Sequence, residues 1–318
     1  MAEQLIHIWH KCSHCGARPI SNTRYHCTSC PAGPENDFCE TCYNAFKNGD
    51  IEHPSIDISG ENKTHTFIPI EGKTQEQYEQ WVHVNQPNVV SPSIPHGFLV
   101  RPEFRSGHDS YFGSHGFVVK SEKGNLLITA LHVLDELIKK VMIDTTAANE
   151  NYTGKELPRY INSVNLYNVL EDKWMFFEMG TAGPMMVLPD ARTDDEEPYS
   201  YRDIAAFLIE GNCEIKLGRL ASVTPDIGEP VWLAAKLRGS RNIHQAVVVE
   251  KTERTFIFRY KESTLDLKLT SGAPILNKNG EVVGINIGAG FYKEQHFGHA
   301  NHVENIRWHL KEGSNPRG

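Results

Sequence analysis

The sequence contains no run of about 18 apolar residues, the length that a membrane-spanning helix needs. It begins Met1-Ala2-Glu3-Gln4-Leu5, without the basic segment and apolar stretch of a secretory signal. Its formal net charge is −8, so it lacks the positive balance that is typical of nucleic-acid-binding proteins. We therefore expect neither a membrane nor a nucleic acid among its partners.

Cysteine is almost missing from most of the chain. Six of the seven cysteines lie between Cys12 and Cys42, and Cys213 is the only one in the remainder. A single cysteine can form no internal disulfide, whereas disulfides are common in secreted domains. Together with the missing signal, this absence predicts a reducing compartment and a cytoplasmic protein.

The length of 318 residues exceeds one typical domain and favours two. From Gly72 to about Pro95 the composition turns polar; its first part, 74–81, is compatible with a short helix, and its proline-containing second part is compatible with an extended segment. We therefore predict an N-terminal module over 1–70, a linker over 71–95 and a second domain over 96–318.

The early cysteines form three pairs, each with two residues between its partners. This spacing lets both sulfurs of a pair reach one metal ion at about 2.3 Å. Six thiolates fall two short of two tetrahedral zinc sites, and histidines that follow the last pair supply the rest. So short a segment buries too little apolar surface to fold unaided, so we expect two structural zinc ions. The pairs are Cys12/Cys15, Cys27/Cys30 and Cys39/Cys42, and the histidines are His53 and His65.

The residues around these pairs resemble the ZZ-type zinc finger over roughly 7–70. The resemblance implies a cross-brace, in which alternate pairs share a metal: Cys12, Cys15, Cys39 and Cys42 would bind one zinc, and Cys27, Cys30, His53 and His65 the other. His7, His14 and His26 are further histidines available in place of His53. The matching stretches are Cys12-Ser13-His14-Cys15, Arg24-Tyr25-His26-Cys27-Thr28-Ser29-Cys30, Asp37-Phe38-Cys39-Glu40-Thr41-Cys42 and His65-Thr66-Phe67.

Two acidic residues, Glu35 and Asp37, precede the third cysteine pair. In the ZZ family an acidic patch at this place often captures the free N-terminal amine of a peptide, and carboxylates suit an ammonium group through charge-assisted hydrogen bonds. The alternative is that Asp37 caps a turn and Glu35 is solvated. Both interpretations stay open, because the inserted Ala32-Gly33-Pro34 alters the loop before the acids.

From residue 96 onward, short apolar runs alternate with Gly, Asn, Asp and Pro, a pattern that is typical of all-β structure. Lys278-Asn279-Gly280 lies between two such runs and predicts a hairpin turn. The closing stretch 303–310 is compatible with a helix. The clearest predicted strands are Gly116–Val119, Asn125–Thr129 and Glu281–Ile285.

Three distant stretches each carry one member of a hydrolytic triad. A serine hydroxyl is a poor nucleophile at neutral pH, and it needs a histidine to take its proton and an acid to orient that histidine. The order His, Asp, Ser matches the chymotrypsin fold and differs from the orders of subtilisin and the α/β-hydrolases. The stretches are Thr129-Ala130-Leu131-His132, Asp203-Ile204-Ala205-Ala206-Phe207 and Thr270-Ser271-Gly272-Ala273-Pro274.

On these residues, most of 100–312 resembles trypsin-like serine proteases that lack disulfides. The resemblance implies that Ser271 attacks the scissile carbonyl, His132 shuttles the proton and Asp203 orients the imidazole. The predicted fold is therefore mainly β, a double β-barrel trypsin-like protease domain preceded by a small cross-brace zinc-finger module.

Two positions depart from the family. Leu269 stands two residues before the serine, where the family has a glycine whose N–H helps form the oxyanion hole, and losing one such donor costs about 10²–10³ in rate. Thr270 replaces the aspartate of zymogen-activated proteases, so we expect no such activation switch. Asp266, near the family's pocket floor, would either favour a basic substrate residue or pair with Lys268.

The functional prediction is a cytoplasmic serine endopeptidase that acts on a protein or peptide substrate. Its zinc module would recognise a protein or peptide ligand, such as a free N-terminus. One alternative is a catalytically weak or inactive pseudo-protease that binds partners through the ZZ finger. Another is a reader protein in which the finger dominates. A His132–Ser271 separation near hydrogen-bond reach, with Asp203 behind, would favour the enzyme.

Overall fold

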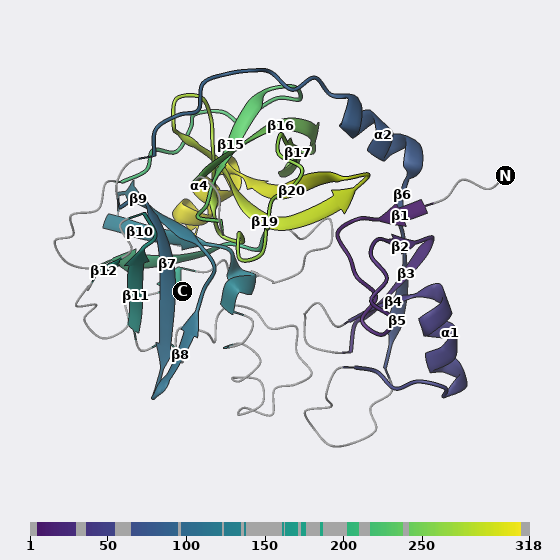
Figure 1. The fold of residues 1–318 in the computed structure, drawn as a ribbon. Helices are drawn as coiled ribbons and strands as arrows, with labels where there is room; N and C mark the ends of the chain where they lie inside the picture. Colours follow the sequence, from purple (N-terminus) through teal and green to yellow (C-terminus); the bar gives the residue numbers. More distant parts are fainter. Residues whose placement is uncertain are drawn as a thin grey trace. The chain divides into compact units, whose positions relative to one another are not determined.

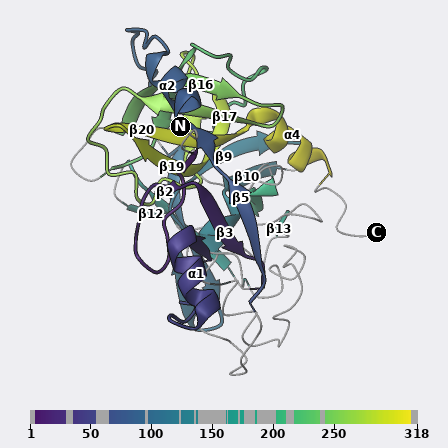
Figure 2. The same cartoon turned by 90° about the vertical axis from the view of Figure 1, so that its right-hand side faces the viewer.

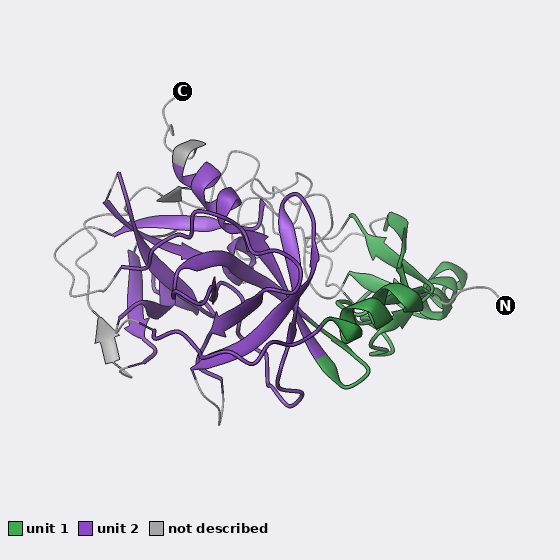
Figure 3. Ribbon diagram, turned by 90° about the horizontal axis from the view of Figure 1, so that it is seen from above, with its two compact units in different colours: residues 1–84, 139–150, 290–295 green, residues 85–138, 151–289, 296–318 purple. Residues whose placement is uncertain are grey.

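The computed structural model describes residues 5–29, 36–54, 65–94, 97–122, 124–134, 137, 161, 163–170, 173–175, 185–186, 202–209, 217–237 and 242–312. The chain divides into two compact units, which Figure 3 colours separately. Unit 1 comprises 1–84, 139–150 and 290–295, and unit 2 comprises 85–138, 151–289 and 296–318.

Among the described residues, unit 1 holds two small antiparallel sheets and the helices α1 and α2. The first sheet has the order β2-β1-β6 and the second the order β4-β3-β5. Helix α1 (Glu40–Asn48) packs against β3 and β4; Figure 2 shows the helix beside β3. The strands are β1 (Leu5–His7), β2 (Ile20–Ser21), β3 (Thr23–Cys27), β4 (Asp37–Cys39), β5 (Phe67–Glu71) and β6 (Lys73–Thr74).

Helix α2 (Gln75–His83) confirms the short helix expected after Gly72. Thr74 begins it with a capping box: its hydroxyl accepts from the N–H of Gln77 at 3.3 Å, and its own N–H donates to Gln77 Oε1 at 2.8 Å. Tyr78 and Trp81 are the buried residues of the helix. The first part of the predicted linker is therefore an ordered element of unit 1.

Unit 2 begins with an eight-stranded antiparallel sheet. Its strands follow the order β12-β11-β7-β9-β10-β14-β13, with β8 on β7. Among the residues that the structure describes, this sheet does not close. The strands are β7 (Leu99–Ser106), β8 (Asp109–Phe112), β9 (Gly116–Ser121), β10 (Gly124–Thr129), β11 (Ser163–Asn168), β12 (Lys173–Met175), β13 (Met185–Met186) and β14 (Ala205–Ile209).

The second half of unit 2 is a closed six-stranded barrel with the order β15-β16-β17-β20-β19-β18 (Figure 1). Helix α4 (Val303–Glu312) follows the last strand. The hairpin turn at 278–280 joins β18 to β19 as predicted, with Gly280 donating to the Asn277 carbonyl at 3.0 Å. The strands are β15 (Pro230–Ala234), β16 (Ile243–Lys251), β17 (Thr255–Tyr260), β18 (Pro274–Leu276), β19 (Val282–Tyr292) and β20 (Gln295–His302).

Among the described residues of unit 2, the buried apolar side chains form two clusters. One fills the barrel, where Phe258 leaves no room for a side chain at Gly298: a Cβ there would lie 2.1 Å from the ring. The other joins the sheet to the barrel, because Phe117 and Ile128 of the sheet share a buried cluster with Trp232 and Ile285 of the barrel. This shared core packs β9 and β10 of the sheet against the barrel.

These features confirm the predicted mainly β fold, in which one β-body closes as a barrel and the other is an eight-stranded sheet. The three predicted strands are β9, β10 and the start of β19, and the predicted C-terminal helix is α4. None of the helices in the described part of the chain has the length and apolar character to span a bilayer.

The folding stability of unit 2 should depend on pH because of its buried histidines. His302, at the end of β20, is 2 % exposed, and burial followed by the nearby charge of Lys251 lowers its pKa to about 4. An unfolded chain binds this proton near pH 6.5, so the contribution to stability is full above pH 6.5 and is lost as pH falls toward 4. Within that window, each such histidine lowers the free energy of unfolding by at most about 1.4 kcal/mol for each unit by which the pH falls.

We expect His302→Gln to reduce the loss of stability between pH 7 and pH 5. The measurement is the opening free energy of β20 amides from hydrogen exchange, corrected for the intrinsic exchange rate at each pH. His108→Gln, at an exposed position, is the matched control. If the opening free energy of β20 falls equally with pH in wild type and in His302→Gln, the prediction is wrong.

Candidate functional site

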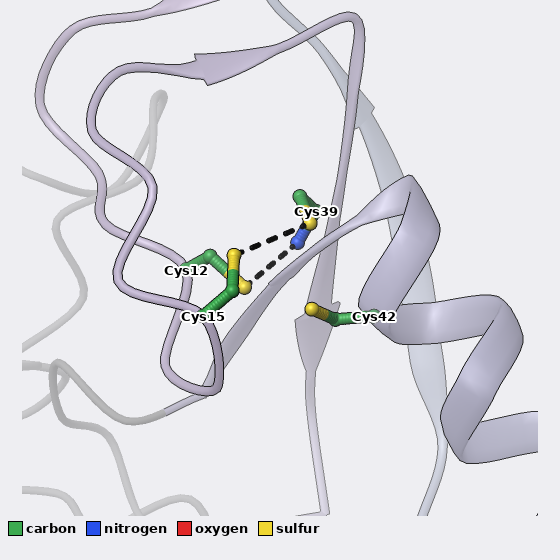
Figure 4. A group of neighbouring side chains, drawn as sticks. All are labelled: Cys12, Cys15, Cys39 and Cys42. Carbon is green, nitrogen blue, oxygen red and sulfur yellow. Dashed lines mark hydrogen bonds between the residues drawn. The ribbon is translucent and has the colours of Figure 1, made fainter. Parts of the chain in front are cut away.

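Four cysteines of unit 1 surround one point, as Figure 4 shows. The sulfurs of Cys12, Cys15, Cys39 and Cys42 lie within 4.8 Å of one another. Cys15 Sγ and Cys39 Sγ are 3.8 Å apart, which is about the edge of a tetrahedron whose metal–sulfur bonds are about 2.3 Å long. Burial raises the pKa of the Cys12 thiol, but backbone N–H groups, first that of Cys39, lower it to about 7 and favour the thiolate.

A second cluster joins Cys27, His53 and His65, whose donor atoms also lie within 4.8 Å of one another. Cys27 Sγ is 3.5 Å from His65 Nδ1, and the two imidazole rings stack at 4.2 Å. Cys30, the fourth predicted ligand, lies outside the described residues. The first cysteine pair thus groups with the third, and a histidine pair groups with Cys27, as in a cross-brace.

The other histidines considered as ligands have different surroundings. His7 Nε2 is 2.9 Å from the Asn22 carbonyl, and His26 Nδ1 is 2.9 Å from Asp37. His14 is exposed. His53 is therefore the histidine that accompanies His65. Thiolates and imidazoles are the donors that zinc prefers, so both clusters suit this metal.

The carboxylate of Asp37 lies inside the finger. Its Oδ1 accepts from Arg24 Nη1 at 2.6 Å and lies 2.9 Å from His26 Nδ1, while Oδ2 lies 3.0 Å from His10 Nδ1. Burial alone would raise the pKa of this carboxyl, but the hydrogen bonds from both histidines and the charge of Arg24 hold it well below its usual range. The side chain is only 8 % exposed. Its predicted role in peptide binding stays a prediction, as does that of Glu35, which lies outside the described residues.

Arg24 is 1 % exposed, and the Asp37 carboxylate at 2.6 Å helps to compensate its buried charge. Removing one partner of a buried ion pair leaves an unpaired buried charge. We expect Asp37→Asn to lower the free energy of unfolding of the finger by about 3–5 kcal/mol, measured by urea titration with zinc present. The exposed Asp50→Asn is the control, and equal midpoints for the two variants would contradict a structural role of the pair.

His132 and Asp203 meet because their strands are neighbours in the sheet. His132 lies on the 3-10 turn η1 (Leu131–Leu134) directly after β10, and Asp203 lies two residues before β14. The β10–β14 register pairs Thr129 with Ala205. Asp203 Oδ2 is 2.5 Å from His132 Nδ1, and its Oδ1 accepts from the His132 backbone N–H at 2.8 Å. The buried carboxylate therefore fixes both the ring and the backbone of His132.

Ser271 lies in the loop between β17 and β18, and this loop packs on the segment before β9. The Ser271 carbonyl accepts from the His115 N–H at 3.1 Å. Gly272 has φ +80°, and a Cβ there would lie 2.1 Å from the His115 carbonyl oxygen and 2.4 Å from Thr129 Oγ1. Ser271 thus lies beside the end of β10, from which His132 follows.

Among the described residues, no hydrogen bond joins Ser271 Oγ to His132 Nε2. Such bonds are often long in structures without substrate and tighten only in the substrate complex. Ser271 itself is half-buried, and the His132 side chain is 25 % exposed. The structure therefore joins His132 to Asp203 and places the Ser271 loop beside the end of β10, and it leaves the contact between serine and histidine open.

Leu269 adopts the left-handed backbone conformation, with φ +62°, that a glycine would take without cost. Within the part of the chain that the structure describes, the backbone N–H groups of Leu269 and Ser271 donate no hydrogen bond. Thr270 between them is buried: its hydroxyl donates to the Leu267 carbonyl at 2.8 Å, and its carbonyl accepts from Asn286 Nδ2 at 3.2 Å. The N–H groups of Leu269 and Ser271 therefore stay without an acceptor on either side of Thr270, which its own hydrogen bonds hold in place.

His115, which the sequence reasoning missed, contacts this loop through its ring. Its Nδ1 lies 2.5 Å from the Leu269 carbonyl oxygen, and its Nε2 accepts from the Lys236 backbone N–H at 3.3 Å. The residue is 3 % exposed, and burial lowers its pKa to about 4 despite that hydrogen bond, with a further lowering from Arg101. The local sequence Ser114-His115-Gly116 does not predict this contact, because Leu269 lies 154 residues away.

Asp266 is exposed and accepts a hydrogen bond from the Lys268 backbone N–H at 3.3 Å. Of the two interpretations considered for it, this placement favours a local turn contact. Cys213 lies outside the described residues.

One comparison with known proteins concerns the finger. Residues 6–52 match the family described as zinc finger, ZZ type. No curated protein matches the chain. Solved structures similar to it are proteases: the active form of the Rv3671c protease from M. tuberculosis (17 % identity, TM-score 0.44, 74 % of this chain and 94 % of that one), the serine endoprotease from Yersinia pestis (15 %, 0.43, 74 % and 67 %), and the MamO protease domain from Magnetospirillum magneticum (16 %, 0.41, 67 % and 95 %).

These TM-scores are low, so the fold assignment rests on the strand order and register of this chain. The N-terminal segment 6–52 is a ZZ-type zinc finger with a cysteine cluster that suits zinc.

Proposed function

We propose that the chain is a serine endopeptidase of a reducing, cytoplasmic setting, and that it cleaves a protein or peptide substrate with the triad Ser271, His132 and Asp203. The observation that carries the proposal is the double hydrogen bond from His132 to the buried Asp203 carboxylate. A histidine whose Nδ1–H is held in this way presents Nε2 as a base. The packing of the Ser271 loop beside the end of β10 supports the same assignment.

The chemistry follows from these positions. Ser271 Oγ attacks the scissile carbonyl carbon while its proton passes to His132 Nε2, and Asp203 stabilises the resulting imidazolium. The unused N–H groups of Leu269 and Ser271 are the donors for the oxyanion. The imidazolium then gives its proton to the amine nitrogen as the C–N bond breaks, which leaves the acyl-enzyme. In the second half His132 takes a proton from a water whose oxygen attacks the acyl carbon, and it returns that proton to Ser271 Oγ as the ester bond breaks.

Labelling with a fluorophosphonate probe tests the proposal. We expect wild type to react at Ser271, Ser271→Ala to lose labelling entirely, and His132→Ala to label at least about 10²-fold more slowly because the general base is gone. Ser222→Ala, at an exposed serine, is the matched control. Intact-mass measurement of the adduct checks each variant after circular dichroism has shown that it is folded.

A folded wild type that the probe does not label would overturn the enzymatic proposal. The chain would then be a pseudo-protease that binds partners through its finger. The missing Ser271–His132 hydrogen bond is the observation that favours this alternative.

For the finger we propose two structural zinc ions in a cross-brace. Cys12, Cys15, Cys39 and Cys42 would bind one ion; Cys27, Cys30, His53 and His65 would bind the other. All positions of both tetrahedra would be filled by protein ligands, so these ions have no catalytic role. The finger is further proposed to bind a protein or peptide ligand. The acids proposed for a free N-terminus are Glu35 and Asp37, and the carboxylate of Asp37 already has three partners within the finger.

Metal removal gives a separate test. Native mass spectrometry should find two zinc ions per chain, and chelation should unfold the finger while the barrel stays folded, because only the finger lacks a sufficient apolar core. Hydrogen exchange in α1 and in β17 reads out the two parts independently. We expect Cys42→Ser to lose one ion and the matched Cys213→Ser to lose none. A single transition that melts both parts would contradict this assignment.

A further inference from the structure

The conformation of the loop before Ser271 depends on few contacts. Leu269 is 59 % exposed, so packing of its side chain does little to hold its backbone. Its neighbours are fastened separately: Lys268 by Asp266, and Thr270 by the Leu267 carbonyl and Asn286. In the described part of the chain, the ring of His115 is the partner of the Leu269 carbonyl.

This contact opposes the relaxation that a leucine would otherwise undergo. An L-residue in the left-handed region relieves a clash of its Cβ when φ becomes negative. Such a change rotates the N–H of Leu269 relative to its carbonyl, so the N–H leaves its place beside Ser271. A donor bound to the carbonyl resists that rotation, because the hydrogen bond would have to break first.

The His115 ring is well suited to this task. Its Nε2 accepts the Lys236 N–H, which leaves the single proton of the neutral ring on Nδ1, facing Leu269. Its backbone contributes as well, since the His115 N–H binds the Ser271 carbonyl and its carbonyl oxygen lies against Gly272. One residue therefore touches three successive features of the loop.

We propose that His115 is a positioning residue that holds Leu269 in the left-handed conformation and thereby keeps the Leu269 N–H available as an oxyanion donor. The inference rests on the proposed serine endopeptidase function. It assigns to a buried histidine the task that the glycine of related enzymes performs by its own backbone freedom.

The test compares His115→Asn with His115→Leu in the full-length, zinc-loaded protein. The Asn amide nitrogen stands at the same number of bonds from the backbone as Nδ1 and can donate to Leu269, whereas Leu has similar size and no donor. We expect His115→Leu to lower the maximal rate of fluorophosphonate labelling by about 10²-fold with little change in the half-saturating probe concentration. His115→Asn should stay within about tenfold of wild type. Equal rates for the two variants, both folded, would overturn the proposal.

A second substitution makes the test specific to the backbone of the loop. Glycine adopts positive φ without the Cβ clash, so Leu269→Gly should not need His115. We expect Leu269→Gly to restore the labelling rate of His115→Leu to within about tenfold of Leu269→Gly alone. If the two losses simply multiply, His115 acts through something other than the conformation of Leu269.

Crystal structures of His115→Leu and His115→Asn separate this inference from the proposed function. If wild type fails to label, the enzymatic proposal fails, but the contact is still tested by the structures. We expect Leu269 to leave positive φ in His115→Leu and to keep it in His115→Asn. An unchanged Leu269 in His115→Leu would sink the inference even if the wild-type enzyme is active.

Discussion

The arrangement of the site depends on one close contact, that of the loop 269–272 with the segment before β9. Gly272 has no side chain, and the space that a Cβ would occupy there is taken by the His115 carbonyl oxygen and the Thr129 hydroxyl. The Thr129 hydroxyl also donates to that same carbonyl at 2.7 Å, so the contact is tied into the end of β10. Because His132 follows β10 directly, this contact brings the Ser271 loop close to the turn that carries His132. The contact can form only because the apolar core shared by sheet and barrel brings the two bodies together.

The loop is held by terms of similar size. A left-handed leucine costs about 1–2 kcal/mol, and a hydrogen bond contributes about 0.5–1.5 kcal/mol net. Neither term dominates, so the conformation of Leu269 is set by the His115 contact as much as by the intrinsic preference of the backbone. With glycine at this position the first cost would vanish, and the loop would not depend on a partner. The substitution that looks like a defect in the sequence therefore comes with a compensating contact in the fold.

The finger shows a different balance. Its apolar core is small, with Cys12, Ile20, Phe38 and Cys42 fully or nearly buried, and two of these four belong to the four-cysteine cluster. The buried Asp37–Arg24 pair adds specificity to this core and costs desolvation that the hydrogen bonds of His10 and His26 help to offset. Because the Asp37 carboxylate is already bound by Arg24, His10 and His26, it is less available to a ligand. The carboxylate beside the third cysteine pair thus serves the fold first.

The sequence by itself determined the elements and the chemistry that they carry. Cysteine spacing pointed to the metal clusters, apolar runs to β9, β10 and β19, and the order His132, Asp203, Ser271 to the protease-like plan. These features are local or ordered along the chain, so pattern and spacing suffice to find them. The tertiary structure alone decided that Asp37 pairs with Arg24 and that the His115 ring contacts the Leu269 carbonyl. Each of these is a contact between residues distant in sequence, and no local pattern encodes it, because its energy arises only when packing has brought the partners within hydrogen-bond reach.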